Sequence, residues 1–163
     1  MFDKFGEMGS AEEINELARN LLKEGDTESI RALAKENGLD PALADEFITG
    51  EMDILCDDMS AAIGKLDVEA GELKTAEIME DWVEYVKARC FEEEEIAKAV
   101  RSKEKSLKGM IGELLKWSFK HQSEIDKGIL KAAGVNASRC TLGIPGMGTA
   151  KKLITEYYLG GAK

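Results

Sequence analysis

A succession of helix-start and helix-stop signals most constrains what this chain can fold into. Ser10, followed three residues later by Glu13, forms the capping box that begins a helix, and Gly25 ends the apolar pattern behind it. Asp26 and Asp40, the latter followed by proline, provide two further helix starts. Between these signals the apolar side chains recur every three to four residues, which is the period of one helical face. The first part of the chain is therefore predicted to form three short helices.

The same period continues through most of the remaining sequence. It predicts a fourth helix, then a linker over residues 67–74, and then a long helix from Thr75 that extends into the glutamate run. Residues 107–119 form an apolar helical stripe, and a shorter helix is expected to end at Gly134. Residues 138–144 look extended and are expected to form a packed loop or one half of a small ribbon. The predicted fold class is all-α, a compact helical bundle of about eight to nine short helices with a glycine-rich loop before the C-terminal helix.

The length of 163 residues suits a single domain with its own hydrophobic core. The predicted linker leaves open a subdivision into an acidic helical part, residues 1–66, and a helical part with a basic C-terminal segment, residues 75–163. No apolar run approaches the roughly 20 residues that span a bilayer, and the N-terminus lacks the pattern of a signal peptide. We therefore expect a cytoplasmic protein with no membrane partner.

Charge is distributed unevenly along the chain. Residues 1–97 contain 9 Lys and Arg against 27 Asp and Glu, whereas residues 98–163 contain 13 against 5, which gives net charges of −18 and +8. The acidic part is expected to repel nucleic acid and attract basic surfaces. The basic part could pair with the acidic part of the same chain or with phosphate, and the sequence leaves both open.

Residues for catalysis are few. His121 is the only histidine in the sequence, and Cys56, Cys90 and Cys140 form no CxxC pair. This composition argues against a catalytic triad built with histidine, a zinc site or a disulfide framework. Paired carboxylates such as Glu77 and Asp81 are expected to be solvated helix faces. A non-enzymatic protein without metal or cofactor is therefore expected.

A glycine-rich turn precedes the last helix, and it is either an anion site or a structural corner. As an anion site, its free backbone N–H groups and two lysines would lie at a helix N-terminus. As a corner, its glycines would supply positive φ angles for a tight turn. The candidate phosphate or nucleic-acid contacts are Gly146, Gly148, Thr149, Lys151, Lys152, Lys105, Lys108 and Lys116.

Acidic and aromatic residues give a second set of expectations. The candidate partner-facing carboxylates are Asp57, Asp58, Glu92, Glu93, Glu94 and Glu95. Among the aromatic residues, Trp82 and Phe119 are expected in the core, because aromatic side chains at helical spacing usually pack there. Trp117 and Tyr158 are expected on the surface beside the lysines.

The segments "MFDKFGEMGSAEEINELA", "KSLKGMI" and "LGIPGMGTAKKLITEYYLGG" together resemble a family of small proteins carried by phages and conjugative elements of gut Firmicutes. The resemblance covers the entire chain. It implies a context in which compact acidic proteins bind host defence or replication machinery. Inhibitors of RNA-guided nucleases, the anti-CRISPR proteins, are one such group.

Two functional hypotheses follow. The leading one is a non-enzymatic interaction protein of a mobile genetic element. Its acidic part would bind and inhibit a host protein that has a basic surface and handles nucleic acid, such as an RNA-guided Cas nuclease. The alternative is an accessory protein that binds nucleic acid through its basic C-terminal part.

Overall fold

Helices account for most of the chain. The computed structural model describes residues 3–160 and contains nine helices and one two-stranded ribbon in that range, which confirms the all-α class. The first two residues and Gly161 of the segments quoted above lie outside the described residues. The helices are α1 (Ala11–Lys23), α2 (Thr27–Glu36), α3 (Pro41–Thr49), α4 (Asp58–Leu73), α5 (Ile78–Glu92), α6 (Glu94–Arg101), α7 (Leu107–Lys120), α8 (Lys127–Ala132) and α9 (Met147–Leu159).

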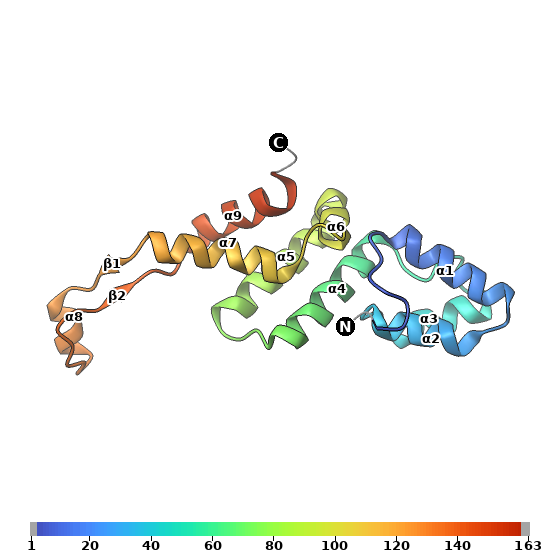
Figure 1. Cartoon of the computed structure of the whole chain (residues 1–163), viewed down its shortest axis with the longest axis horizontal. Coiled ribbons are helices and arrows are strands. Elements are labelled where there is room, and N and C mark those ends of the chain that lie inside the picture. The colour runs from blue at the N-terminus through green and yellow to red at the C-terminus, as the bar shows by residue number, and fades with distance from the viewer. Residues whose placement is uncertain (1–2, 161–163) are drawn as a thin grey trace.

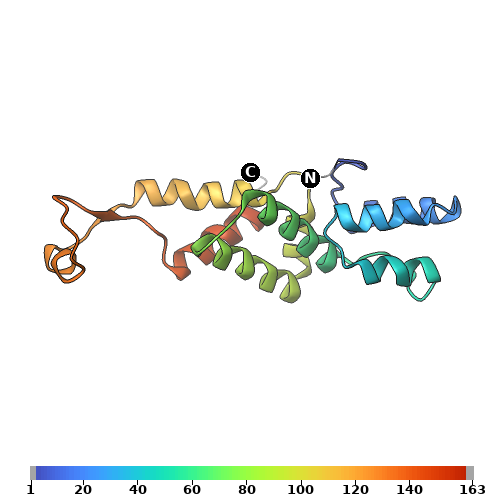
Figure 2. The same cartoon turned by 90° about the horizontal axis from the view of Figure 1, so that it is seen from below.

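These elements form three regions along an elongated molecule (Figure 1). Helices α1 to α3 make an N-terminal lobe at one end. Helices α4 to α7 and α9 make a central body. Residues 121–146, which include α8 and the ribbon strands β1 (Ser123–Glu124) and β2 (Thr141–Leu142), form an arm at the other end, and Figure 2 shows the same order from below.

The N-terminal lobe follows the sequence prediction closely. The side chain of Ser10 accepts a hydrogen bond from the N–H of Glu13 (3.1 Å), and the Glu13 carboxylate accepts from the N–H of Gly9 (2.8 Å). Asp26 and Asp40 cap α2 and α3 in the same way. These side chains satisfy backbone donors that a helix start leaves without partners, so the local sequence is sufficient to begin each helix. The lobe has its own core, which includes Ile14, Ile30, Leu33 and Phe47.

The predicted linker over residues 67–74 is wrong. Helix α4 begins at Asp58, where Asp57 accepts from the N–H of Ser60 (2.7 Å), and it continues to Leu73. Its buried face includes the polar side chains of Lys65 and Glu69, which interrupt the apolar period that sequence reasoning relies on. Because α4 contributes Ala61 to the core of the N-terminal lobe and Leu66 to that of the central body, it connects the two.

The long helix expected from Thr75 is two helices. Helix α5 begins at Ile78 and ends at Glu92, and Glu93 is extended (φ −137°, ψ 110°) before α6 starts. The chain changes direction here, so that Cys90 from α5 and Ile96 and Val100 from α6 reach the same core. The glutamate run therefore lies at a helix junction rather than along one helix.

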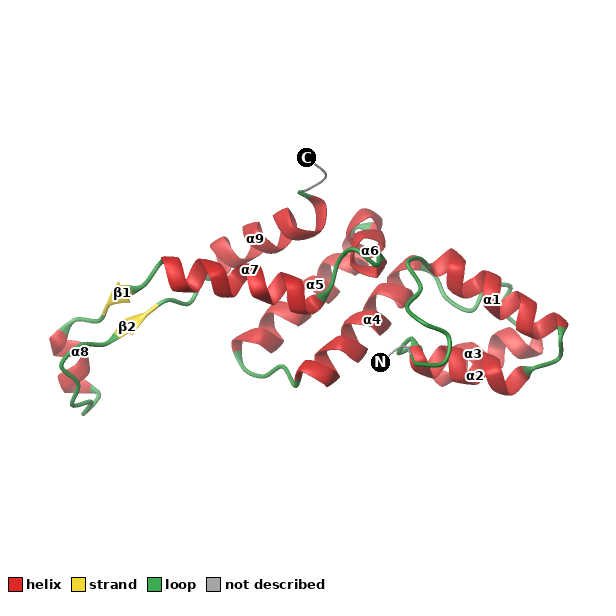
Figure 3. Ribbon diagram, in the orientation of Figure 1, coloured by secondary structure: helices red, strands yellow, loops and turns green. Residues whose placement is uncertain are grey.

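The arm confirms the expectation of a ribbon around residues 138–144. Strands β1 and β2 are antiparallel, with Ser123 opposite Leu142, and the N–H of Ile125 donates to the carbonyl oxygen of Cys140 (2.9 Å). Figure 3 shows the two short strands between α7 and the tip of the arm. Helix α8 is followed by Gly134, whose positive φ of 68° ends it as predicted.

Two aromatic expectations are wrong. Phe119 is 76% exposed, because it lies in the last turn of α7, which leads away from the body into the arm (Figure 1). Tyr158 is buried in the core of the body, which it enters from α9. Trp82 is buried as expected. The period of a helix shows which residues share a face, but it does not show how far along that face a neighbour extends.

Candidate functional site: an acidic groove and its surroundings

A polar junction holds the N-terminal segment and the N-terminal lobe on the central body. The ammonium group of Lys65, fully buried, lies 2.7 Å from the carboxylate of Glu7. It also donates to the carbonyl oxygens of Ser102 (2.7 Å) and Lys105 (2.8 Å). A buried ammonium group is tolerated only when its donors are satisfied, and these three acceptors satisfy them.

Arg101 makes a second connection at the same junction. Its guanidinium group is buried and donates to the carbonyl oxygens of Met8 (3.0 Å) and Ala61 (3.3 Å) and to the side chain of Asn37 (2.5 Å). Burial lowers the pKa of Arg101 below its usual range, and nearby carboxylates including Glu7 oppose this effect. The junction is structural, because its polar groups bind one another rather than facing solvent.

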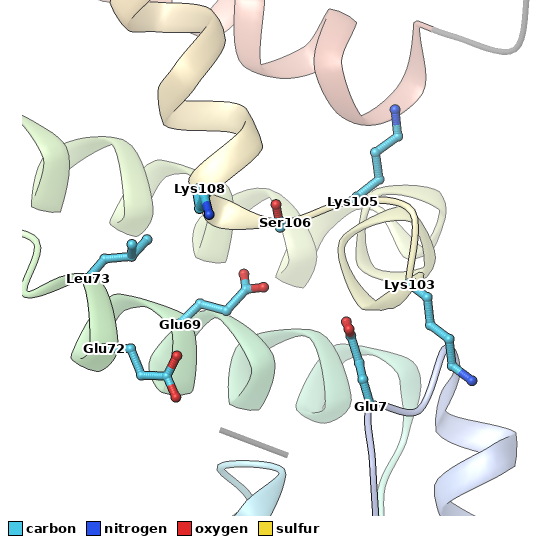
Figure 4. A pocket seen from close by; sticks show the side chains of 8 residues that line it. All are labelled: Glu7, Glu69, Glu72, Leu73, Lys103, Lys105, Ser106 and Lys108. Carbon is cyan, nitrogen blue, oxygen red and sulfur yellow. The ribbon is translucent and has the colours of Figure 1, made fainter. Parts of the chain in front are cut away.

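A hollow of about 470 Å³ lies beside this junction (Figure 4). Glu69 is almost completely buried at its wall and accepts a hydrogen bond from the N–H of Leu107 (2.7 Å), and burial raises the pKa of this carboxyl. The predicted anion contacts Lys105 and Lys108 both line the hollow. Lys105, however, points toward α9, where its ammonium group donates to the carbonyl oxygen of Tyr157 (2.6 Å). The complete lining is Glu7, Glu69, Glu72, Leu73, Lys103, Lys105, Ser106 and Lys108, in which carboxylates balance the lysines.

A second hollow lies where α4 begins and α5 passes into α6, and we call it the acidic groove. Its volume is about 270 Å³, and its lining consists of Asp57, Asp58, Met59, Cys90, Phe91, Glu94 and Ala97. The ring of Phe91 is 66% exposed at its edge. Lys98 bridges the groove by pairing with Glu94 and, at 3.6 Å, with Asp58. The fold therefore brings three predicted partner-facing carboxylates, from α6 and from the start of α4, around one exposed aromatic ring.

The acidic surface extends beyond the groove. Asp57 and Asp58 also line a neighbouring hollow of about 510 Å³, together with Glu12 and the exposed side chain of Ile54. The other predicted carboxylates, Glu92, Glu93 and Glu95, are exposed at the α5–α6 junction. Glu93 forms an ion pair with Arg89 (2.7 Å).

The glycine-rich turn leads directly into α9, whose Ile154 is buried in the core of the body. Gly146 has a φ of −62° and Gly148 lies in the first turn of α9, so the explanation by positive φ angles is wrong. The lysines expected beside it serve separate contacts: Lys151 lies 5.2 Å from the ring centroid of Tyr85, and Lys152 is 3.9 Å from Glu156. Thr149 is partly buried, and Lys116 pairs with Glu113 on α7. The candidate basic residues are therefore not gathered into one anion site.

Sequence reasoning missed Phe91. Trp82, Val86 and Cys90 follow one another at intervals of four, and a residue directly after Cys90 lies about 100° away from that line of side chains. This spacing does not by itself predict exposure, because Val83, directly after Trp82, is buried. The polar junction could not be found in this way, since Lys65 and Arg101 look like ordinary surface cations in the sequence.

Comparisons with other proteins provide no relative for this chain: no family model matches it, and neither the curated proteins nor the solved structures yield a match. Within residues 3–160 there is no cluster of three or more metal-ligating side chains. In the same range no helix combines the length and the apolar character needed to cross a membrane.

Proposed function

We propose that this chain is a non-enzymatic interaction protein that uses its acidic groove to bind a basic surface of a protein that handles nucleic acid. The observation that supports it most directly is the grouping of Asp57, Asp58 and Glu94 around the exposed ring of Phe91. Carboxylates steer and orient a basic partner, while a partly exposed aromatic ring can provide the buried anchor on which affinity depends.

The charge of the acidic part remains available to a partner. Of the 27 Asp and Glu side chains in residues 1–97, all of which the structure describes, Glu69 alone is buried. Two lysines of the basic part form ion pairs with these carboxylates. Lys98 pairs with Asp58 and Glu94, and Lys103 pairs with Glu13. Other basic residues pair within their own part of the chain, as Lys116 does with Glu113. A negative surface of this size resembles a nucleic-acid backbone in sign.

A mobile-element context, which the sequence resemblance implies, makes inhibition of host machinery the proposed role. In this proposal the acidic surface occupies a basic channel that otherwise holds a nucleic-acid duplex. An RNA-guided Cas nuclease is the proposed partner, because its heteroduplex lies in a positively charged channel.

Binding to a purified, guide-loaded nuclease tests the proposal. The protein should compete with the target duplex, and its affinity should fall by at least about tenfold between roughly 0.05 M and 0.5 M salt, because exposed charges are screened. At a given salt concentration, the variant Phe91→Ala with Glu92→Lys should bind the nuclease more weakly than the wild type does. The control Leu22→Ala with Glu24→Lys also removes an exposed apolar side chain and reverses a charge, at the C-terminal end of α1. Affinity indifferent to salt, or equal loss in both variants, would overturn the proposal.

A further inference from the structure

We infer that the arm of one copy of this chain docks on the acidic groove of a second copy, whose Phe91 enters a hollow at the arm's tip. Self-association of this kind requires the acidic groove and the arm but no host partner. It therefore goes beyond the proposed function, and self-association and partner binding can each fail while the other holds.

The arm lacks a core of its own. The exposed fractions of Ile129, Val135, Leu142 and Ile144 are 61%, 48%, 55% and 52%. A two-stranded ribbon is only marginally stable by itself in water, and the apolar side chains exposed along the arm are available to contact another molecule. An arm of this composition gains stability when a second surface covers it.

The tip of the arm provides a receptor for an aromatic ring. A hollow of about 400 Å³ lies between α8 and the turn after it. Its lining combines apolar side chains with two cations and consists of Lys127, Leu130, Lys131, Gly134, Val135, Asn136 and Ala137. Phe91 has the opposite character, since its ring is exposed among carboxylates.

Charge complementarity identifies a second copy as the occupant. The arm, residues 121–146, contains three Lys and Arg against two Asp and Glu, and two of its three cations, Lys127 and Lys131, line the hollow at the tip. Two tips would therefore bring like charges together, whereas the lysines of a tip and the carboxylates of the acidic groove attract. Nucleic acid would also attract the arm, but a phosphate backbone offers no apolar contact for Ile129 and Val135. The acidic groove offers both kinds of contact.

The contact must be between copies rather than within one. The arm extends away from the central body in both views, and its tip lies far from the α5–α6 junction of its own chain (Figures 1 and 2). An arm-to-groove contact uses two different surfaces, so it is heterologous and leaves one free arm and one free groove in every open assembly. Such contacts produce growing assemblies or closed rings, and they can cover the groove before a partner is bound.

Sedimentation of the purified full chain over a range of concentrations tests the inference. The wild type should shift from the monomer mass of 17.9 kDa to dimers and larger species, and salt should reverse the shift. An arm variant, Lys127→Glu with Lys131→Glu, and a groove variant, Phe91→Ala with Glu92→Lys, should each associate at least about tenfold more weakly. The control Lys23→Glu with Lys35→Glu, on exposed lysines of the N-terminal lobe, should associate as the wild type does.

Mixing the two variants is the decisive measurement. The arm variant retains an intact groove and the groove variant an intact arm, so the mixture should form a complex that stops at one copy of each. Circular dichroism checks that both variants are folded, and Ile129→Ser with Val135→Ser is a second arm variant in case the first is not. A wild type that stays monomeric would overturn the inference. So would a mixture without the complex, or an arm that binds a labelled DNA duplex while the chain does not self-associate.

Discussion

Gly38 and Gly64 approach each other so closely that a Cβ atom on Gly38 would lie 2.3 Å from the carbonyl oxygen of Gly64. The reverse also holds, since a Cβ on Gly64 would lie 2.2 Å from the carbonyl oxygen of Asn37. The turn after α2 therefore packs directly on the backbone of α4. This contact and the hydrogen bonds of Arg101 set how the N-terminal lobe sits on the central body.

Gly64→Ala is expected to lower the free energy of unfolding by about 2 kcal/mol or more, because the added methyl group meets backbone rather than a movable side chain. Gly71→Ala on the same helix is the matched control. Nothing lies within 4 Å of a Cβ at Gly71, so alanine should stabilise α4 there by about 0.5–1 kcal/mol. Urea denaturation of the two variants measures both values, and equal effects would contradict the close approach.

Arg101→Met is expected to cost about 3 kcal/mol, because the carbonyl oxygens of Met8 and Ala61 and the side chain of Asn37 lose their donor inside the protein. The N-terminal lobe should also become more sensitive to proteolysis, since two of these acceptors belong to segments that pack in its core. Arg139→Met, on the exposed arm, should change the unfolding midpoint little. The prediction fails if the two substitutions have similar effects.

Glu69 should make stability depend on pH. Burial raises the pKa of its carboxyl in the folded protein above the ordinary value of 4.5. Between that value and the raised pKa, the folded state binds more protons than the unfolded state, so stability falls as pH rises through this window. Below this window Glu69 is protonated in both the folded and the unfolded state, so the free-energy cost of burying its charged form is absent.

Glu69→Gln removes this titration but keeps an oxygen that can accept from the N–H of Leu107. The stability of this variant relative to wild type should therefore increase as pH rises above 4.5 and then level off. Guanidinium denaturation at a series of pH values measures the difference. Glu80→Gln, an exposed change on α5, is the control, and a difference that does not vary with pH for Glu69→Gln would refute the assignment.

The three cysteines should differ in reactivity. Burial raises the pKa of Cys56 to about 12 and that of Cys90 to about 11, so both thiols stay protonated and inaccessible in the folded protein. Cys140 is partly exposed on the arm. A thiol reagent should therefore modify Cys140 rapidly under native conditions, and Cys56 and Cys90 only after the protein unfolds. Rapid labelling that persists in Cys140→Ser would show that the core opens.

Local sequence determined where most helices begin and end, because capping side chains, a helix-first proline and stop-signal glycines act on the nearest turn of backbone. Ser10, Asp26, Asp40 and Gly134 all behave as their positions in the sequence indicate. The uneven charge is likewise a property of the sequence alone.

Tertiary structure decided what the sequence could not. Lys65 and Glu69 are buried because a second helix layer and the N-terminal segment cover them, and nothing adjacent in the sequence shows that cover. Phe119 is exposed because it lies in the last turn of α7, where the chain leaves the body for the arm. Asp57, Asp58 and Glu94 meet because the chain turns at Glu93. Helix starts depend on contacts a few residues apart, whereas burial and site assembly depend on contacts between residues distant in sequence.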